Sequence, residues 1–233
     1  MVAVAVLGLI QYLLIPNVSF LAAANWDNHY FRLVSTFLDP GFTGAILTLG
    51  LFSSFNPIVF TALALTYSRA AYLMYFIGFG LLAWYKRSLR LFVATTLILL
   101  VAVAVLPKTF GEGTKLDREA SIFSRVESWQ VAIHLWQKAP VFGIGFDTYR
   151  YATNNNAVSH SGAGSDSSLL NILATTGIVG LVAYLYLLKN LWFAGKTLFK
   201  VSLAAVLINS WFNNGLLYPW LMEYLWLLLV FDS

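Results

Sequence analysis

The chain has 233 residues, of which 59% are apolar and only 10% are charged. Because a soluble domain carries about 25% charged residues, this composition indicates an integral membrane protein. The chain contains no cysteine, which excludes disulfides, thiolate catalysis and cysteine-bound metals. The net charge of +4 does not indicate binding to nucleic acid, because the basic residues are scattered or adjoin apolar segments.

The apolar segments predict an all-α protein, a polytopic bundle of transmembrane helices. A helix that crosses a bilayer needs about 20 apolar residues. Three segments approach this length and five are shorter, so we expect roughly seven or eight crossings in a single membrane domain over residues 1–233. The longer segments are 70–85, 91–107 and 169–188, and the shorter ones are 1–15, 41–54, 57–67, 201–212 and 220–231.

Two details refine the first half of the chain. Segment 1–15 lacks the basic residues that begin a signal peptide, so a first span is the better interpretation. The sequence SSFNP at 53–57 contains Asn-Pro, a turn signal that disfavours a continuous helix. We therefore expect segments 41–54 and 57–67 to form a hairpin rather than one span.

The distribution of Lys and Arg predicts the orientation, since short cytoplasmic loops are rich in both. YKRSLR at 85–90 and KNLWFAGKTLFK at 189–200 each carry three basic residues and no acid, so we expect both to be cytoplasmic. Two spans separate them, which makes the large loop at about 108–168 external. Its six basic and six acidic residues cancel, which is consistent with the translocated side. Arg69 then lies at the external end of its span, and the predicted hairpin also makes Arg32 external.

The external loop begins with a predicted amphipathic helix. In the segment EASIFSRVESWQVAIHLWQKAP, which Pro140 ends, apolar residues recur at helical spacing. They are Ile122, Val126, Trp129, Ile133 and Trp136. The face that bears the tryptophans suits the membrane interface or the top of the bundle. The following PVFGIGFDTYRY contains Gly143 and Gly145, which allow a tight backbone path.

The loop ends in SHSGAGSDSSLLNILATTGIVG (159–180), which changes from polar to apolar at Leu169. Ser165 or Asp166 fits the N-cap of the following helix. Asp166 has two compatible interpretations, a structural cap alone or a general base at the external mouth of the bundle. Polar residues then recur every four positions, a stripe that usually faces the bundle interior or a cavity. These are Ser167, Asn171 and Thr175.

Three other residues have both a structural and a functional interpretation. Arg69, between two apolar runs in LTYSRAAYL, either extends to the interface or belongs to a site. Arg125 is either a solvated or interfacial charge or a phosphate ligand, for which its guanidinium fork is suited. His160, in a Gly/Ser-rich segment, is either a surface residue or has a chemical role. The sequence contains no HExxH, P-loop or acidic metal pair, which disfavours metal catalysis.

Four segments, in this order, resemble the O-antigen ligase / O-antigen polymerase family of bacterial membrane glycosyltransferases. They are RLVSTFLDPGFTGAIL (32–47), TYSRAAYL (66–73), SRVESWQVAIHLWQKAPVFGIGFDTY (124–149) and DSSLLNILATTGIVGL (166–181). In the family the last block usually begins His-Asn, with that His proposed as catalytic, whereas here Asp166-Ser167 occupies the place. The family also usually has more spans before this region, so we expect the chain to be its C-terminal part.

The resemblance implies transfer of a glycan from a polyprenyl-diphosphate carrier to the hydroxyl of a glycan, lipid or protein acceptor, without a metal or cofactor. It implies a protein of the bacterial inner membrane that contacts membrane lipids and has its active face in the periplasm. The arginines would stabilise the diphosphate, and Asp166 or His160 would act as base. The expected catalytic residues are Asp166, Arg69, Arg125 and His160, and the expected substrate contacts are Arg32, Trp129, Gly143, Gly145 and Asn171.

Three alternatives stay open. The first is a polymerase of the same family. The second is a transporter or flippase of lipid-linked substrates, although transporters tend to place charges near the bilayer midplane and to contain internal repeats. The third is a non-catalytic scaffold, if missing spans remove part of the donor site.

Overall fold

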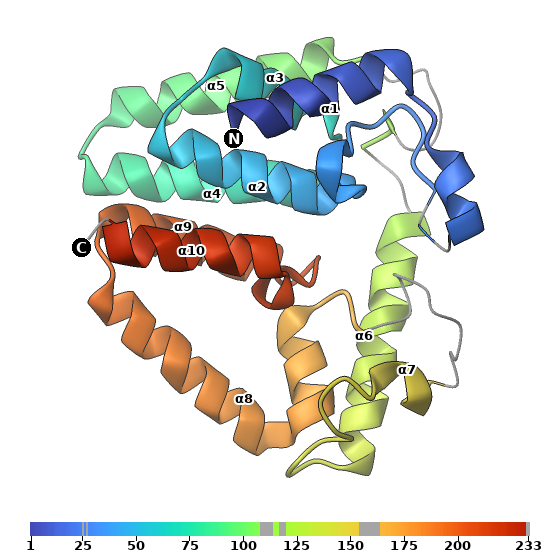
Figure 1. Cartoon of the computed structure of the whole chain (residues 1–233). Helices are drawn as coiled ribbons and strands as arrows, with labels where there is room; N and C mark the ends of the chain where they lie inside the picture. The colour runs from blue at the N-terminus through green and yellow to red at the C-terminus, as the bar shows by residue number, and fades with distance from the viewer. Residues whose placement is uncertain (25, 27, 108–113, 117–119, 154–163, 232–233) are drawn as a thin grey trace.

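The computed structural model describes residues 1–24, 26, 28–107, 114–116, 120–153 and 164–231. Within these ranges the regular elements are helices, joined by turns and by an isolated bridge between Asn17 and Tyr30 (Figure 1). The prediction of an all-α chain is therefore confirmed for the described residues.

Most of the helices form one bundle, in which they run roughly alongside one another (Figure 1). They are α1 (Val2–Leu14), α2 (Pro40–Ser53), α3 (Pro57–Leu65), α4 (Arg69–Tyr85), α5 (Leu89–Val105), α9 (Thr197–Asn209) and α10 (Pro219–Phe231). Short 3-10 helices join some of them, namely η1 (Ser19–Ala24), η2 (Ser35–Phe37) and η4 (Gly215–Leu217). The core is built around α4, which packs against α2, α5 and α9. Its fully buried side chains include Leu47, Leu49, Met74, Tyr75 and Leu203.

Helix boundaries in the bundle follow capping signals in the sequence. Asn56 caps α3, because its Oδ1 accepts the N–H groups of Ile58 and Val59 at 2.9 and 3.3 Å. Pro57 occupies the first turn of α3, where no N–H group is required. Helices α2 and α3 are therefore separate, and they pack against each other. The predicted hairpin is confirmed.

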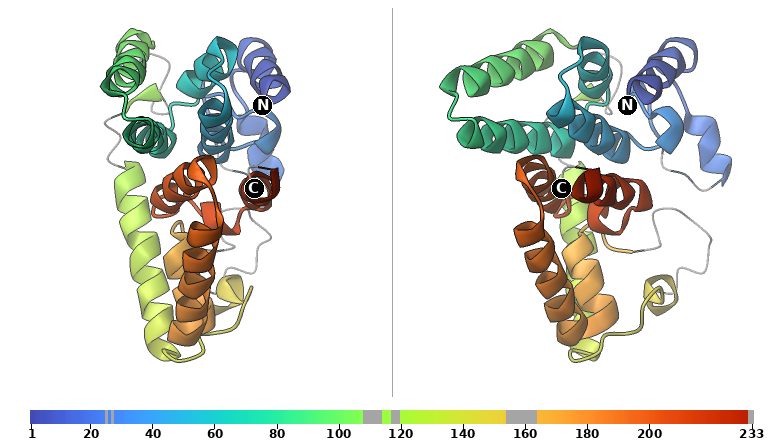
Figure 2. Two further views of the ribbon diagram at one scale, coloured as in Figure 1. Left: turned by 90° about the vertical axis from the view of Figure 1, so that its left-hand side faces the viewer. Right: turned by 60° about the vertical axis from the view of Figure 1, so that its left-hand side comes forward.

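Helix α6 (Ala120–Lys138) lies crosswise to the bundle helices, at one end of the bundle (Figures 1 and 2). It confirms that this segment of the predicted external loop is helical. Three residues of the predicted apolar face, Ile122, Val126 and Ile133, are exposed. A different face packs inward against α7 (Tyr149–Ala152) and α8 (Ser168–Ala194) and forms a second, small core. This second core consists of Ala132, Leu135, Tyr149 and Ala174.

Helix α8 bends sharply at Gly177, whose φ of 67° and ψ of −168° lie outside the helical region. Its two limbs diverge as the V in Figure 1. The Ile178 N–H donates to the Pro140 carbonyl at 3.0 Å, and the Val179 N–H donates to the Val141 carbonyl at 3.2 Å. The predicted span at 169–188 lies within this helix, and the sequence analysis did not predict its bend. The turn after α6 replaces hydrogen bonds of the helix, and this stabilises the bend.

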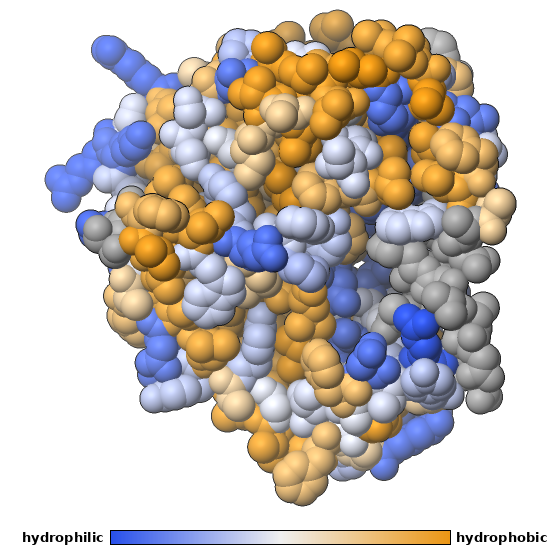
Figure 3. Space-filling view, in the orientation of Figure 1, coloured by the Kyte–Doolittle hydropathy of each residue, from blue (hydrophilic) through white to orange (hydrophobic). Residues whose placement is uncertain are grey.

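Apolar side chains cover much of the visible outer surface of the helices (Figure 3). Exposed examples on α1, α5, α8 and α10 are Leu13, Leu100, Val182 and Phe231. Of the described helices, α8 is the one that has both the length and the hydropathy of a membrane span, and five shorter helices are also apolar. The predicted number of crossings stays a prediction.

The two basic turns lie at the same end of the bundle. The turn between α4 and α5 and the turn between α8 and α9 both lie at the left of Figure 1. Helices α2 and α4 begin at the opposite end. A pocket of about 640 Å³ opens beside the α4–α5 turn, with Trp84, Arg87 and Phe92 in its lining. The pocket therefore lies far from the end at which α2 and α4 begin.

Candidate active site

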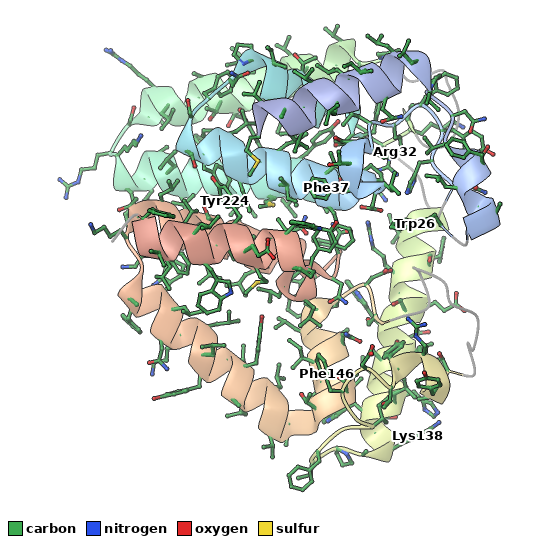
Figure 4. All side chains as sticks on the ribbon, in the orientation of Figure 1. Trp26, Arg32, Phe37, Lys138, Phe146 and Tyr224 are labelled. Carbon is green, nitrogen blue, oxygen red and sulfur yellow. The ribbon has the colours of Figure 1, made fainter. Side chains whose placement is uncertain are left out.

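The three arginines expected in the site lie at one end of the bundle, although they come from separate segments. Arg32 precedes η2, Arg69 is the first residue of α4, and Arg125 lies on α6. Figure 4 shows Arg32 at the end of the bundle nearest the start of α6. We call Arg32, Arg69 and Arg125 the arginine cluster.

Backbone carbonyls position the first two arginines. The Arg32 Nε donates to the Thr66 carbonyl at 2.9 Å, and its Nη2 donates to the Tyr67 carbonyl at 3.5 Å. Because these carbonyls lie in the turn that leads into Arg69, Arg32 is fixed beside the start of α4. The Arg69 Nη1 donates to the Leu116 carbonyl at 3.0 Å. The structure therefore brings Arg32 and Arg69 to the same end of the bundle, as the predicted hairpin requires.

Arg125 lies within electrostatic reach of three charged side chains. Burial is the largest cause that lowers the pKa of its guanidinium. The charge of Asp166 opposes this shift, Arg69 adds to it, and Asp39 opposes it. The Arg125 Cζ also lies 5.8 Å from the centroid of the Phe212 ring, a cation–π contact. Because a guanidinium stays protonated in proteins, a bound anion would stabilise this partly buried charge.

The backbone of Asp166 is held against α6. Its N–H donates to the Ser128 Oγ at 3.0 Å, and the Ser165 Oγ lies 3.4 Å from the same hydroxyl oxygen. The residue that caps α8 is Ser167, whose Oγ accepts the Leu170 N–H at 3.5 Å. The N-cap predicted at Ser165 or Asp166 is therefore wrong. The contact with α6 places both residues before the first turn of the helix.

Tyr149 is a residue of this region that the sequence analysis did not identify. It is buried, and burial is the largest cause that raises the pKa of its hydroxyl to about 12. The negative charge of Asp166 adds to the shift, and a hydrogen bond with Ser165 opposes it. The phenol is therefore protonated at neutral pH, beside the carboxylate. Sequence periodicity could not reveal it, because α7 has only 4 residues.

The predicted polar stripe of α8 is buried, which agrees with the expectation that it faces the interior. Its residues are Ser167, Asn171 and Thr175. The Asn171 Oδ1 accepts the Ser165 N–H at 3.3 Å. A Cβ on Gly164 would lie only 2.9 Å from the same oxygen. Asn171 therefore holds the segment that leads into Asp166, and its predicted contact with substrate stays a prediction.

Gly143 and Gly145 lie against the bend of α8. Their φ angles are +70° and +111°, conformations that side chains disfavour. The Ile144 N–H donates to the Ala174 carbonyl at 3.0 Å, and the Gly145 N–H donates to the Thr175 carbonyl at 2.9 Å. A Cβ on Gly143 would lie 2.3 Å from the carbonyl carbon of Thr175. These contacts give both glycines a structural role, while the predicted substrate contact stays a prediction.

Trp129 lies one turn along α6 from Arg125. Its ring is 6.5 Å from that of Trp211 and 6.4 Å from that of Phe212, between centroids. Its Nε1 is buried and has no hydrogen-bond partner among the described residues. A buried indole N–H normally has a partner, so this group is a candidate donor to a ligand. The predicted role of Trp129 in substrate binding is consistent with this position.

A second pair of residues near the arginine cluster was not identified from the sequence. The His29 Nε2 lies 3.7 Å from the Asp39 Oδ2, and both side chains are largely buried. Burial opposes ionisation of Asp39, but His29, the Phe42 N–H and Arg32 together lower the pKa of its carboxyl group. The sequence signals only the cap, since Asp39 precedes Pro40 at the start of α2. Nothing in the sequence pattern marks His29.

A hollow opens between the end of the bundle and α6, with hydrophilic residues at its edge (Figure 3). In the same orientation, Arg32 and Phe37 are labelled at the edge of the bundle above it (Figure 4). His160 lies outside the described residues. Within the described ranges there is no group of three or more His, Cys, Asp or Glu residues that could hold a metal ion. Catalysis without a metal therefore stays a prediction.

The comparisons with known proteins identify the family. A family model described as O-antigen ligase matches residues 57–185, which is more than half of the chain. The matched segment contains Arg69, Arg125 and Asp166, whereas Arg32 and the His29–Asp39 pair precede it. No curated protein and no solved structure matches the chain. The chain belongs to the O-antigen ligase family, a family of bacterial inner-membrane proteins.

Proposed function

We propose that the protein is a membrane glycosyltransferase that moves a glycan from a polyprenyl-diphosphate carrier to an acceptor hydroxyl. The observation that carries the proposal is the arginine cluster. Three guanidinium groups from separate segments meet at one end of the bundle, and two of them lie in the segment matched to the O-antigen ligase family. The acceptor is a glycan, a lipid or a protein.

The distribution of residues supports a membrane location with several crossings. Large apolar side chains are exposed along the bundle helices, whereas Ser202, Asn209 and Ser210 of the α9 region are buried. This arrangement suits a lipid environment, in which polar groups turn toward the protein interior. We place the basic turns 85–90 and 189–200 in the cytoplasm and the arginine cluster at the periplasmic face.

The arginine cluster would bind the diphosphate of the donor. Arg69 and Arg125 repel each other, since the charge of Arg69 lowers the pKa of Arg125. A diphosphate between them replaces this repulsion with two attractions. Guanidinium groups can also bind phosphate oxygens through two parallel hydrogen bonds. As the diphosphate leaves, its developing negative charge is stabilised by groups that are already in place.

The proposed reaction is a displacement at the anomeric carbon of the glycan. The acceptor oxygen forms a bond to this carbon, and the bond from the carbon to the diphosphate oxygen breaks. The electron pair of that bond leaves with the diphosphate, which the arginine cluster stabilises. The proton of the acceptor hydroxyl passes to a carboxylate or an imidazole. Asp166 is the candidate base that the sequence supplies, and its backbone is held by Ser128 and, through Ser165, by Asn171.

A polymerase of the same family would carry out the same chemistry with a growing glycan as one substrate. The transporter alternative fits the structure less well, because the charges of the arginine cluster gather at one end of the bundle. Coupled transporters place such groups near the middle of the bilayer. A transferase is therefore the better proposal.

A transfer assay with Arg125 variants tests the proposal. The purified protein in lipid nanodiscs receives a polyprenyl-diphosphate-linked glycan and an acceptor, and glycosylated acceptor is measured. We expect Arg125→Ala to reduce transfer by about 10²-fold or more, the scale for loss of one charge-stabilising group. Arg125→Lys should restore part of the rate, because it keeps the charge and loses the planar fork.

Lys138→Ala is the matched control, since Lys138 is an exposed cation at the far end of the same helix. It should keep nearly the full rate of transfer. A folded Arg125→Ala variant that transfers glycan as fast as the wild type would contradict the role of the arginine cluster.

A further inference from the structure

His29 and Asp39 form an ion pair that the mechanism above does not use. Asp39 is fixed as the N-cap of α2, because its Oδ1 accepts the Phe42 N–H at 2.8 Å. The other carboxylate oxygen, Oδ2, faces the His29 Nε2 at 3.7 Å. The His29 backbone is fixed too, since its carbonyl accepts the Val18 N–H at 3.2 Å. The N-cap contact therefore fixes the side chain of Asp39, and a backbone hydrogen bond fixes the loop that carries His29.

The pair belongs to the same group of charges as the arginine cluster. The charge of Asp39 acts on Arg125, and the charge of Arg32 acts on Asp39. Burial, and after it the charge of Asp39, raises the pKa of Tyr218. The Tyr218 ring stacks on that of Phe42 in the first turn of α2. The imidazole that faces Asp39 at 3.7 Å thus belongs to a pair within electrostatic reach of the proposed diphosphate site.

The chemistry of the pair suits proton transfer. A carboxylate beside Nε2 holds the proton of a neutral imidazole on that nitrogen, so that Nδ1 carries the lone pair. The Nδ1 of His29 has no hydrogen-bond partner among the described residues, and the side chain keeps 10% of its surface exposed. Catalytic contacts in a protein without substrate are often long, so 3.7 Å is compatible with a hydrogen bond that shortens as the imidazole gains charge.

Asp166 has a different electrostatic position. Its negative charge is the strongest of the influences that stabilise the charged form of Arg125. Its backbone N–H is bound to Ser128, one turn along α6 from Arg125. Asp166 therefore stabilises the charge of the guanidinium that, in the proposed function, binds the leaving group. A carboxylate engaged with a cation in this way is a weak acceptor for the proton of a hydroxyl.

We infer that His29 is the general base of the transfer reaction, that Asp39 is its positioning residue, and that Asp166 positions Arg125. This inference rests on the proposed function. As the acceptor oxygen bonds to the anomeric carbon, its proton moves to the Nδ1 of His29. The bond to the diphosphate breaks, and its electron pair leaves with the diphosphate. The imidazolium is stabilised by Asp39 and afterwards releases its proton to water.

Three variants separate the roles. His29→Gln should lower kcat by about 10²-fold or more, the scale for loss of a general base, and leave donor binding unchanged. Asp39→Asn keeps a good N-cap for α2 and removes the charge, so the protein should fold while kcat falls. Asp166→Asn should weaken binding of the lipid-linked donor and raise KM more than it lowers kcat. His134→Gln, an exposed histidine of α6, is the matched control and should behave as the wild type.

The pH profile of kcat gives a readout that a structural role would not change. The wild-type rate should fall toward acidic pH, because a general base acts only in its unprotonated form, and this limb should disappear in His29→Gln. The described charged and titratable groups that face the pair are Arg32, Arg125 and Tyr218. Of these, none titrates in that pH range, since two are guanidinium groups and the pKa of Tyr218 is raised to about 12, mainly by burial.

The outcomes distinguish the inference from the proposed function. Thermal unfolding confirms that each variant is folded. If the wild type transfers glycan and His29→Gln keeps both the rate and the acidic limb, the base lies elsewhere and the inference is wrong. If Asp166→Asn then loses kcat with donor binding intact, Asp166 is the base. If the wild type binds the donor and transfers nothing, the proposed function itself fails.

Discussion

At the residue scale, the site is a group of charges whose members stabilise or strain one another. Arg69 and Arg125 are like charges, and Asp39 and Asp166 lie close enough to act on Arg125. Such an arrangement has a net positive charge in the absence of ligand, and a diphosphate would neutralise it. The charges of the two carboxylates stabilise the charged form of Arg125, and the charge of Arg69 opposes it.

The loop before Asp166 depends on one amide side chain. Asn171→Ala removes the oxygen that accepts the Ser165 N–H and leaves that buried donor without its partner. We expect a loss of about 1–3 kcal/mol in the free energy of unfolding, the usual effect of an unsatisfied buried group. Transfer should fall as well, because Asp166 loses its fixed position.

Thermal unfolding and the transfer assay check this prediction together. Asn190→Ala is the control, since Asn190 is exposed on the same helix and its side chain donates only to the Tyr186 carbonyl of its own turn. Equal stability of the two variants would show that the Ser165 contact is unimportant.

At the element scale, the bend of α8 and the turn after α6 form one structural unit. The two segments exchange four backbone hydrogen bonds across the bend, two in each direction. A Cβ on Gly177 would lie 2.2 Å from the Val141 carbonyl oxygen, so the backbones meet where only glycine fits. The bend turns the first limb of α8 alongside α6, and this limb carries Asn171 (Figure 1).

Substitution of either glycine at this contact should disrupt the unit. Gly143→Ala and Gly177→Ala each place a Cβ under 3.0 Å from backbone atoms and force a side chain into a positive φ. Strained backbone alone costs about 1–3 kcal/mol, and the clash adds to it. We expect both variants to unfold at a lower temperature and to lose transfer activity.

Gly80→Ala is the matched control for this prediction. It lies inside α4, where a Cβ would meet Phe92 at an ordinary 3.5 Å and alanine favours the helix. Its stability should equal or exceed that of the wild type. Normal stability and activity of Gly177→Ala would mean that α8 can straighten in the functional protein.

The elements of this fold were largely predictable, because caps, turn signals and apolar periodicity are local. Asn56 and Pro57 predicted the hairpin, and the spacing of apolar residues predicted α6. The bend of α8 was not predictable, since Gly177 lies in an apolar run that also fits a straight helix. Its cause is a tertiary contact with the turn at 140–145, which no local pattern encodes.

The site was predictable only in part, for the same reason. Arg69 and Arg125 stood out because charged residues are rare in this chain, and the structure brings them together. The cap of α8 was misplaced because Ser165, Asp166 and Ser167 are all suitable residues, and a contact with α6 decides among them. His29 lies in a loop without periodicity, so no sequence pattern predicts that it pairs with Asp39.

At the scale of the whole molecule, a bundle with apolar outer faces carries the arginine cluster at one end. The crosswise α6 lies at that end, and the basic turns lie at the other (Figures 1 and 2). In a membrane, this polarity would let the lipid tail of a donor remain among the apolar helices while its diphosphate reaches the arginine cluster. The arrangement thus links the membrane character of the chain to its proposed chemistry.

The most direct test of transfer from a polyprenyl-diphosphate carrier is the stoichiometry of the reaction. Protein reconstituted in nanodiscs with the lipid-linked glycan and an acceptor is sampled over time, and both products are measured by mass spectrometry. We predict one molecule of free polyprenyl diphosphate for each glycan joined to the acceptor, without added metal. Donor that stays intact in the presence of the folded protein, or glycan released to water with the acceptor unmodified, would contradict it.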